Sequence, residues 1–209
     1  MIGAPVADLA SHRIGELAAA LAALGVREHR FLDEIEANGT RYTDSGMTWV
    51  SEGVAGPDPD ATEGFAFADV DEAAARLAAL IREAKPEAVV TYDDFGGYGH
   101  PDHIQAVRVT KRALEMVGDE LNVRLWQRLM PGENASGVVA SEGEAINIDV
   151  APVLDRVLDA MRAHRTQIKD IERAEEPTDE ALAWFALSNS VRQAVPPMET
   201  YVDPGRLGG

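Results

Sequence analysis

Titratable side chains are most concentrated between Asp93 and His103, where six of eleven residues carry one. These side chains are Asp93, Asp94, Tyr98, His100, Asp102 and His103. Imidazole and carboxylate groups bind zinc and act as general acids and bases in hydrolysis. Glycines at positions 96, 97 and 99 let the backbone approach a ligand closely. The segment is therefore predicted to be a metal-binding or catalytic site.

Simpler interpretations of the same segment exist. A histidine at a helix start is often only solvated, and Asp102 could serve as a helix cap. A nucleotide-binding turn is disfavoured, because the glycines lack the G-x-G-x-x-G spacing and the neighbouring Asp side chains would repel phosphate. If His103 lies in the first turn of a helix, the helix dipole favours its neutral form, which is the form that binds metal.

The overall composition narrows the range of partners. Among 209 residues, 36 acidic side chains outnumber 19 basic ones, which gives a net charge of -17. This charge repels nucleic-acid phosphates and anionic lipid headgroups, and no window approaches the roughly 18 consecutive apolar residues that span a bilayer. Because cysteine is absent, a metal would be held by His, Asp or Glu. We expect a cytoplasmic protein that acts on a small molecule, with no nucleic-acid or membrane partner and with an oligomeric state that the sequence does not indicate.

Periodic apolar residues predict the elements that position this segment. The predicted helices cover residues 6–24, 69–84, 101–117 and 151–171, with Pro101 suited to a first helical turn. The predicted strands are residues 30–35, 88–92, 123–129 and 145–150. Little periodicity is found in residues 36–67, which are predicted to be a long substrate-facing loop. The tail at 195–209, rich in Pro and Gly, is predicted to be irregular.

Strands that alternate with helices predict an α/β fold in three layers with a mainly parallel sheet. In such a sheet, ligands bind beyond the carboxyl ends of the strands. Asp93 directly follows the buried parallel strand expected at 88–92, so the candidate site would lie at that edge. The length suits a single domain over residues 1–209.

The run Gly96-Gly97-Tyr98-Gly99-His100-Pro101-Asp102-His103, preceded by Thr91-Tyr92-Asp93, resembles a signature of the PIG-L-like (LmbE-like) zinc-dependent N-deacetylases. Two further stretches, at 13–17 and 44–47, resemble the branch of this family that acts in mycothiol biosynthesis. The resemblance implies a Rossmann-like fold. It also implies zinc-dependent hydrolysis of the N-acetyl group of an amino sugar such as N-acetylglucosaminyl-inositol.

The resemblance further implies roles for individual residues. His103 would be a zinc ligand, His100 the general acid that protonates the departing amine or a group that stabilises the oxyanion, and Tyr98 the hydroxyl that polarises the amide carbonyl. The residues that would bind the sugar and inositol are Arg13, Asp44 and Met47. Those expected to support the site from outside are Asp93 and Asp102. The metal is expected to be zinc, although such sites also accept Fe²⁺ or cobalt.

One signature of the family is missing from the sequence. No His-Pro-Asp-Asp run occurs, although in the family this run follows the first strand and supplies two zinc ligands and the general base. We therefore expect a chain that lacks an N-terminal strand–helix–strand unit, binds zinc weakly and hydrolyses its substrate negligibly. The alternatives are a mycothiol S-conjugate amidase or another sugar deacetylase of the family and, in a different functional class, a non-catalytic sugar-binding remnant.

Overall fold

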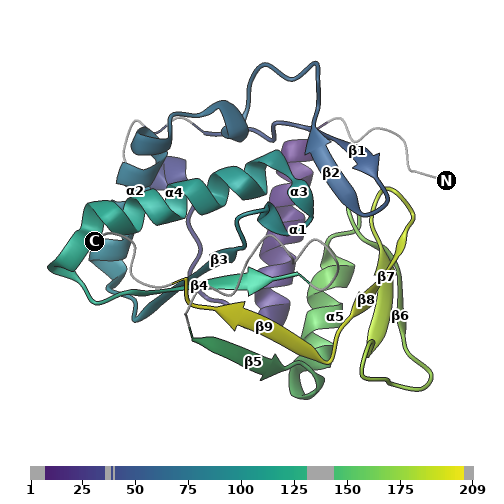
Figure 1. Cartoon of the computed structure of the whole chain (residues 1–209). Helices are drawn as coiled ribbons and strands as arrows, with labels where there is room; N and C mark the ends of the chain where they lie inside the picture. The colour runs from purple at the N-terminus through teal and green to yellow at the C-terminus, as the bar shows by residue number, and fades with distance from the viewer. Residues whose placement is uncertain (1–7, 36–38, 40, 131–143, 205–209) are drawn as a thin grey trace. The chain divides into compact units, whose positions relative to one another are not determined.

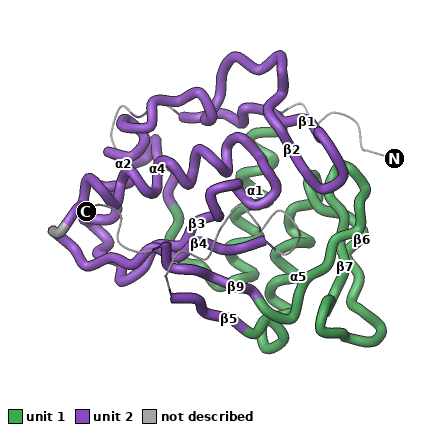
Figure 2. The backbone as a smooth tube through the Cα atoms, in the orientation of Figure 1, with its two compact units in different colours: residues 1–29, 149–198 green, residues 30–148, 199–209 purple. Residues whose placement is uncertain are grey.

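The computed structural model describes residues 8–35, 39, 41–130 and 144–204. They fall into two compact units, each assembled from segments distant in sequence (Figure 2). Unit 1 is Met1–His29 with Asp149–Met198, and unit 2 is Arg30–Ile148 with Glu199–Gly209. The predicted single domain and its three layers depend on how the two units are placed relative to each other, and they stay predictions.

Unit 1 contains two helices that pack against each other, α1 at Leu9–Leu24 and α5 at Leu154–Ala163 (Figure 1). The carboxylate of Asp8 accepts a hydrogen bond from the Ser11 N–H at 3.1 Å, and α1 ends at Gly25, whose φ is 77°. Such an N-cap contributes about 1 kcal/mol, and glycine adopts the left-handed C-cap without strain. The first predicted helix is therefore confirmed from Leu9, while its expected start at Val6 lies outside the described residues.

A three-stranded antiparallel sheet completes unit 1, in the order β6-β7-β8. Its strands are β6 at Lys169–Arg173, β7 at Ala183–Ala186 and β8 at Arg192–Val195. A 3-10 turn at Ala151–Val153 leads into α5. The core between α5 and the sheet consists of Val150, Leu154, Leu158, Leu182, Ala183 and Val195.

The predicted helix over 151–171 is wrong beyond Ala163. The chain turns at His164, and Thr166 donates from its backbone N–H and its hydroxyl to the Glu16 carboxylate at 2.8 and 2.7 Å. Glu16 is only 5% exposed, so these bonds anchor the segment after α5 to α1. This anchoring draws the chain off the helical path, and the apolar Ile171 belongs to β6 instead.

Unit 2 combines two helices with a four-stranded sheet, in the order β3-β4-β9-β5 (Figure 1). The helices are α2 at Val70–Ala84 and α4 at Pro101–Val117. The strands are β3 at Ala88–Tyr92, β4 at Arg124–Leu129, β5 at Ala145–Asp149 and β9 at Met198–Val202. The smaller elements are the antiparallel hairpin of β1 (Met47–Ser51) and β2 (Val54–Pro57), the short α3 at Gly96–Gly99, and 3-10 turns at Leu32–Glu34, Phe65–Phe67 and Gly118–Glu120.

The two helices of unit 2 lie side by side, and α4 also contacts β3. Small side chains let their backbones approach closely, and the buried cluster is Ala73, Ala74, Ala78, Ile81, Val109, Ala113 and Val117. This packing holds the second half of α4 against α2, while the candidate site residues lie at the start of α4. No helix in the described part of the chain is long and apolar enough to cross a membrane.

The α/β class is confirmed, but the sheet is mixed rather than mainly parallel. β3 and β4 are parallel, with Ala88 opposite Arg124, whereas β9 runs antiparallel to β4. The tail after Val195 is therefore not wholly irregular, because β9 pairs with the interior of the sheet. β3 is the end strand of the sheet as described, and Val90 is 60% exposed. The expectation that this strand is buried is thus wrong, although its parallel pairing is confirmed.

Two predictions for the segment before α2 are also corrected. The strand expected at 30–35 is a single 3-10 turn, because the Glu34 carboxylate reaches back to the Phe31 N–H at 2.7 Å and closes it. The long loop at 36–67 contains the β1–β2 hairpin, which turns at Gly53 with φ of 71°. Its strands show no clear period in the sequence because both are short, β1 contains Thr48 and Ser51, and β2 contains Gly56 and Pro57.

Candidate active site

The turn that follows β3 is organised by Asp93, which is 2% exposed. Its Oδ1 accepts hydrogen bonds from the backbone N–H groups of Phe95 at 3.1 Å and Gly97 at 2.9 Å. A carboxylate that accepts two backbone donors fixes the path of the loop. Asp93 therefore stabilises the backbone of the turn, which is consistent with the supporting position expected for it.

Two glycines in this turn are required by the space around them. At Gly96, φ is +70°, and a Cβ would lie 2.8 Å from the backbone nitrogen of Ile104. At Gly99, φ is +92°, and a Cβ would lie 2.5 Å from the carbonyl oxygen of Ala55. Other residues meet both a backbone penalty and a clash at these positions. The turn therefore passes tightly between α4 and β2 and brings Tyr98 and His100 together.

His100 caps α4, as the residue before Pro101 at the first helical position. Its Nδ1 accepts a hydrogen bond from the Asp102 N–H at 3.2 Å, and the residue is 9% exposed. An Nδ1 that accepts carries no proton, so the neutral ring holds its proton on Nε2. The capping bond thus leaves one N–H donor on the opposite side of the imidazole.

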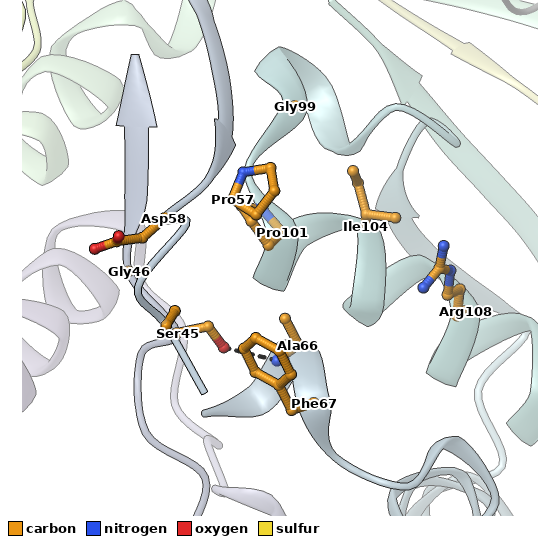
Figure 3. Close-up of a pocket in the computed structure, with 11 residues that line it drawn as sticks. Ser45, Gly46, Pro57, Asp58, Ala66, Phe67, Gly99, Pro101, Ile104 and Arg108 are labelled. Carbon is orange, nitrogen blue, oxygen red and sulfur yellow. Dashed lines mark hydrogen bonds between the residues drawn. The ribbon is translucent and has the colours of Figure 1, made fainter. Parts of the chain in front are cut away.

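Asp102 does not cap α4. Its carboxylate oxygens accept hydrogen bonds from the backbone N–H groups of Ser45 and Ala66, both at 3.0 Å. The Ala66 N–H also lies 2.8 Å from the Ser45 hydroxyl, an interaction drawn in Figure 3. Asp102 therefore ties the start of α4 to two points in the segment between residues 41 and 67.

His103 lies in the first turn of α4 with its imidazole held on several sides. Its Nδ1 is 3.1 Å from the Gly96 carbonyl oxygen. The ring stacks on Tyr92, with centroids 4.2 Å apart and planes 4° apart, and on His100, with centroids 4.8 Å apart. Burial, and then the proximity of His100, lower the pKa of His103 below its ordinary value. The neutral form expected from the sequence is therefore favoured.

Tyr98 meets both histidines at the edge of its ring, with centroid distances of 6.1 Å to His100 and 5.2 Å to His103. On β1, Trp49 stacks on Tyr98 at a centroid distance of 5.7 Å. Burial, followed by the proximity of Tyr92 and Asp44, raises the pKa of Tyr98 to about 12. Its hydroxyl therefore keeps its proton near neutral pH and can donate a hydrogen bond.

The described residues include one group that could hold a metal ion, made of Asp44, His100 and Asp102. One potential ligand atom from each of the three lies within 4.8 Å of the others. Both carboxylates of this group already accept backbone hydrogen bonds, Asp102 from two N–H groups and Asp44 from the Gly46 N–H at 2.8 Å. His103 belongs to no such group of three among the described residues.

The fit to a metal can be judged atom by atom. The Gly96 carbonyl can only accept, so it favours a proton on Nδ1 of His103 and leaves Nε2 as a free lone pair. Histidines that bind metal commonly have their other ring nitrogen held in this way. His103 therefore fits a ligand for zinc or iron, and the nearby carboxylates are of a suitable chemical type.

The two remaining predicted residues, Met47 and Arg13, lie in different units. Met47 is the first residue of β1, in the segment that Asp102 ties to α4. Arg13 lies in α1 and therefore in unit 1, whereas the other candidate site residues lie in unit 2. Its predicted cooperation with Asp44 at a shared substrate stays a prediction.

Two aromatic residues of the site were missed in the sequence. Tyr92 ends β3 and stacks on His103, and Trp49 stacks on Tyr98 from β1. A tryptophan within a polar stretch and a tyrosine at the end of a strand were the available signals. Neither was sufficient, because their ring partners depend on tertiary structure.

A cavity of about 270 Å³ lies beside the turn, next to Gly99 and Pro101 (Figure 3). Its walls are mainly apolar side chains such as Phe67 and Ile104, with Asp58 and Arg108 as its charged members. None of the predicted site residues lines it. The cavity is therefore separate from the cluster of Tyr98, His100 and His103.

Comparison with known proteins points to one family. The family described as PIG-L, GlcNAc-PI de-N-acetylase, matches residues 3–114. A 1D-myo-inositol 2-acetamido-2-deoxy-alpha-D-glucopyranoside deacetylase from Kineococcus radiotolerans is 38% identical, over 92% of this chain and 61% of that protein. The protein of the same description from Streptomyces avermitilis is 36% identical, over 92% of this chain and 71% of its own length.

A third relative is more similar over a shorter stretch. A protein from Catenulispora acidiphila, described as 1D-myo-inositol 2-acetamido-2-deoxy-alpha-D-glucopyranoside deacetylase 2, is 52% identical over 118 residues. That alignment covers 56% of this chain and 36% of the relative. The chain thus spans about 61% of the Kineococcus protein, 71% of the Streptomyces protein and, in the shorter alignment, 36% of the Catenulispora protein.

Proposed function

The chain belongs to the PIG-L family of de-N-acetylases, and from this we propose that its site serves the removal of an N-acetyl group from an amino sugar linked to inositol. Several relatives are described as deacetylases of such an inositol glycoside. The reaction is hydrolysis of an amide, which yields acetate and a free amine. Because the chain spans only part of its relatives, the activity of the whole protein is part of the proposal.

One observation carries the proposal, namely the packing of Tyr98, His100 and His103 into a single cluster at the start of α4. The three rings contact one another, and each keeps a polar atom of a different kind. These atoms are a protonated phenol, an Nε2–H donor and an Nε2 lone pair. Amide hydrolysis needs a donor to the carbonyl oxygen, a proton for the leaving amine and a Lewis acid.

The proposed role of Tyr98 is to donate a hydrogen bond to the carbonyl oxygen as negative charge develops on it. A pKa of about 12 keeps the proton on its hydroxyl throughout the neutral range. His100 would donate a hydrogen bond from Nε2–H to the departing amine; to transfer this proton it would first take up a second proton on Nδ1, in place of the capping bond from the Asp102 N–H. Asp102 supports both groups, since it joins the start of α4 to Ser45 and Ala66.

We propose that His103 binds the catalytic metal through Nε2, with zinc as the expected ion and Fe²⁺ as a substitute. A bound zinc would polarise the acetyl carbonyl and lower the pKa of its water. Arg13, Asp44 and Met47 are the proposed contacts to the sugar and inositol hydroxyls. A catalytic zinc normally has three protein ligands. Since no described group of three includes His103, we expect weak metal binding and slow turnover by this chain.

The first test measures metal content and affinity of the purified chain after incubation with Zn²⁺, Fe²⁺ or Co²⁺. We expect one ion per chain, with affinity reduced by roughly 10–100-fold or more in His103→Gln, in line with the loss of a ligand or its partner. His12→Gln is the matched control, because His12 pairs with Glu16 at 3.4 Å and belongs to no group of three among the described residues that could hold a metal. Equal binding by the wild type and both variants would refute the role of His103.

The second test follows the release of acetate and free amine from N-acetylglucosaminyl-inositol in the metal-loaded chain. Tyr98→Phe should reduce the rate by about 10²–10³-fold, as expected when one donor to an oxyanion is removed. A chain that binds the glycoside in calorimetry without releasing acetate would favour the sugar-binding remnant instead. Release of cysteine-containing products from a mycothiol conjugate, but not acetate, would favour the amidase.

A further inference from the structure

The contact between Tyr92 and His103 is the closest ring stack in the site. Their centroids are 4.2 Å apart and their planes are only 4° from parallel. Tyr92 is the last residue of β3 and remains 37% exposed, so its position is not explained by burial in the core. Neither the sequence motif nor the proposed reaction gives this side chain a task.

An imidazole needs external contacts to hold its orientation. Rotation about the terminal χ2 bond of histidine has broad energy wells. For His103, the Gly96 carbonyl at 3.1 Å from Nδ1 fixes which edge of the ring points inward. It does not fix the plane of the ring, because a single hydrogen bond allows the ring to tilt. The flat face of Tyr92 supplies a second constraint, closer and more nearly parallel than the stack with His100, whose centroid is 4.8 Å away with planes 25° apart.

Tyr92 is itself held by neighbouring elements of unit 2. Its carbonyl oxygen accepts a hydrogen bond from Gln127 Nε2 at 3.1 Å. The same amide nitrogen lies 2.9 Å from Asp94 Oδ1, and Asp94 pairs with Lys111 of α4. Gln127 is 2% exposed and therefore has little freedom to move. The base of the Tyr92 side chain is thus connected to both β4 and α4.

The space beside the Tyr92 ring is also shaped by the turn. A Cβ at Gly97 would lie 3.8 Å from Tyr92 Cδ1 and 3.2 Å from Met130 Cγ. The Gly97 backbone therefore passes close beside the Tyr92 ring, within reach of an ordinary van der Waals contact. The ring stack and the anchored backbone of Tyr92 together describe a built support rather than a chance contact.

We propose that Tyr92 is a positioning residue, whose ring fixes the plane of the His103 imidazole so that Nε2 is presented in one direction to the metal. The inference rests on the proposed role of His103 as a ligand. The aromatic ring of Tyr92 is the group that orients His103, and the Tyr92 hydroxyl is dispensable for this role. Supporting groups of this kind change metal affinity by about 10–100-fold when they are removed.

The test compares Tyr92→Phe, which keeps the ring, with Tyr92→Met and Tyr92→Leu, which replace it by flexible or branched apolar chains. In ¹⁵N-labelled, metal-free protein, the ring nitrogen shifts of His103 report its tautomer directly. Because a ring that is free to tilt no longer keeps its Nδ1–H bond to the Gly96 carbonyl, we expect a single Nδ1–H tautomer in the wild type and in Tyr92→Phe, and a mixture of tautomers in Tyr92→Met. Zinc titrations should then show an affinity unchanged in Tyr92→Phe and lowered by about 10-fold or more in Tyr92→Met.

Val117→Ala is the control for lost stability, because Val117 is 2% exposed and lies at the far end of α4. It should lower the melting temperature without altering the His103 tautomer or zinc affinity. The proposal is overturned if Tyr92→Met or Tyr92→Leu, whichever folds, keeps both the tautomer and the affinity of the wild type. It is equally overturned if Tyr92→Phe loses them, since the hydroxyl would then be the essential group.

The two readouts separate this inference from the proposed function. If His103 binds no zinc in any variant, the ligand role fails, while the tautomer comparison still shows whether Tyr92 orients the ring. If zinc binds at His103 and the tautomer is insensitive to Tyr92, the ligand role survives and the positioning role is refuted.

Discussion

Replacing Asp102 by Asn tests whether one carboxylate holds the start of α4 against the segment that precedes α2. Asp102 accepts the Ser45 N–H on Oδ2 and the Ala66 N–H on Oδ1, both at 3.0 Å. Asparagine has nearly the same shape, but only its carbonyl oxygen can accept. Its NH2 group would face the second backbone N–H, so Asp102→Asn must lose at least one of the two hydrogen bonds.

The size of the effect follows from this count. A hydrogen bond to a charged group contributes about 1.5–3 kcal/mol, and an unsatisfied donor adds a desolvation cost of similar size. The Ala66 N–H keeps the Ser45 hydroxyl as a second acceptor at 2.8 Å, whereas Ser45 is 5% exposed, so water does not easily replace an acceptor lost by its N–H. We expect Asp102→Asn to lower the free energy of unfolding by about 2–3 kcal/mol. For a chain of this length, that corresponds to a fall in melting temperature of about 4–12 °C.

The assay is thermal and urea unfolding of the wild type, Asp102→Asn and Asp69→Asn, combined with amide hydrogen exchange. Asp69 caps α2 by accepting the Glu72 N–H at 2.9 Å. Asn is as good an N-cap as Asp, so this control should change stability by less than about 0.5 kcal/mol. Faster exchange at the Ser45 and Ala66 amides in Asp102→Asn would locate the loss.

The reasoning would be refuted by an Asp102→Asn protein as stable as the Asp69→Asn control, with both amides still protected. Such a result would mean that the Ser45–Ala66 segment is held by other contacts. A loss of stability without faster exchange at these two amides would be equally inconsistent, because the destabilisation would then arise elsewhere.

Three further predictions concern other parts of the chain. Burial raises the pKa of Glu16, but hydrogen bonds from Thr166 and the nearby His12 and His164 outweigh it and lower that pKa below its ordinary value of 4.5. The carboxylate therefore stabilises the fold above pH 4.5, and urea unfolding should show that this contribution disappears as the pH falls further. Glu16→Gln should be less stable than the wild type at neutral pH, and its stability should change less with pH in acid. Gly99→Ala should lose about 1–3 kcal/mol through its strained φ and its clash with Ala55, while Gly15→Ala, which meets no atom within 4 Å in α1, should be neutral or stabilising in thermal unfolding. Trp49→Leu removes the stack on Tyr98 and should lower kcat/KM for deacetylation by about 2–10-fold, the worth of an aromatic pair; an unchanged kcat/KM would show that Tyr98 needs no support from β1.

The sequence predicted best where the signal is local. Apolar residues at helical spacing predicted α2 and α4, and the glycines and histidines of residues 96–103 predicted one compact site. The lowered pKa of His103 agrees with the neutral form expected from its place in the first turn of a helix, but its causes are burial and then the proximity of His100. The caps were local as well, since Pro101 and Gly25 mark a helix start and a helix end by their own backbone preferences.

What the sequence could not predict depends on contacts between distant segments. Nothing near Asp102 indicates that its partners are Ser45 and Ala66, so a helix cap was the natural local interpretation. The end of α5 is set by the bonds of Thr166 to Glu16 in α1, whereas the apolar stripe of the sequence continues past that point. The stack of Trp49 on Tyr98 depends in the same way on the position of the β1–β2 hairpin.

The strand order β3-β4-β9-β5 also bears on how this protein can fold as it is made. β9 lies between β4 and β5 but leaves the ribosome only after α5 and the whole β6-β7-β8 sheet. During synthesis β5 is therefore unpaired, and one edge of β4 is exposed, until β9 has been synthesised and pairs with them. Pairing between such distant segments is slow and leaves strand edges open to association. Yield during expression should accordingly depend on how quickly β9 docks, which makes the β4–β9 pair a target for stabilising substitutions at positions other than Gln127, whose side chain contacts Tyr92 and Asp94.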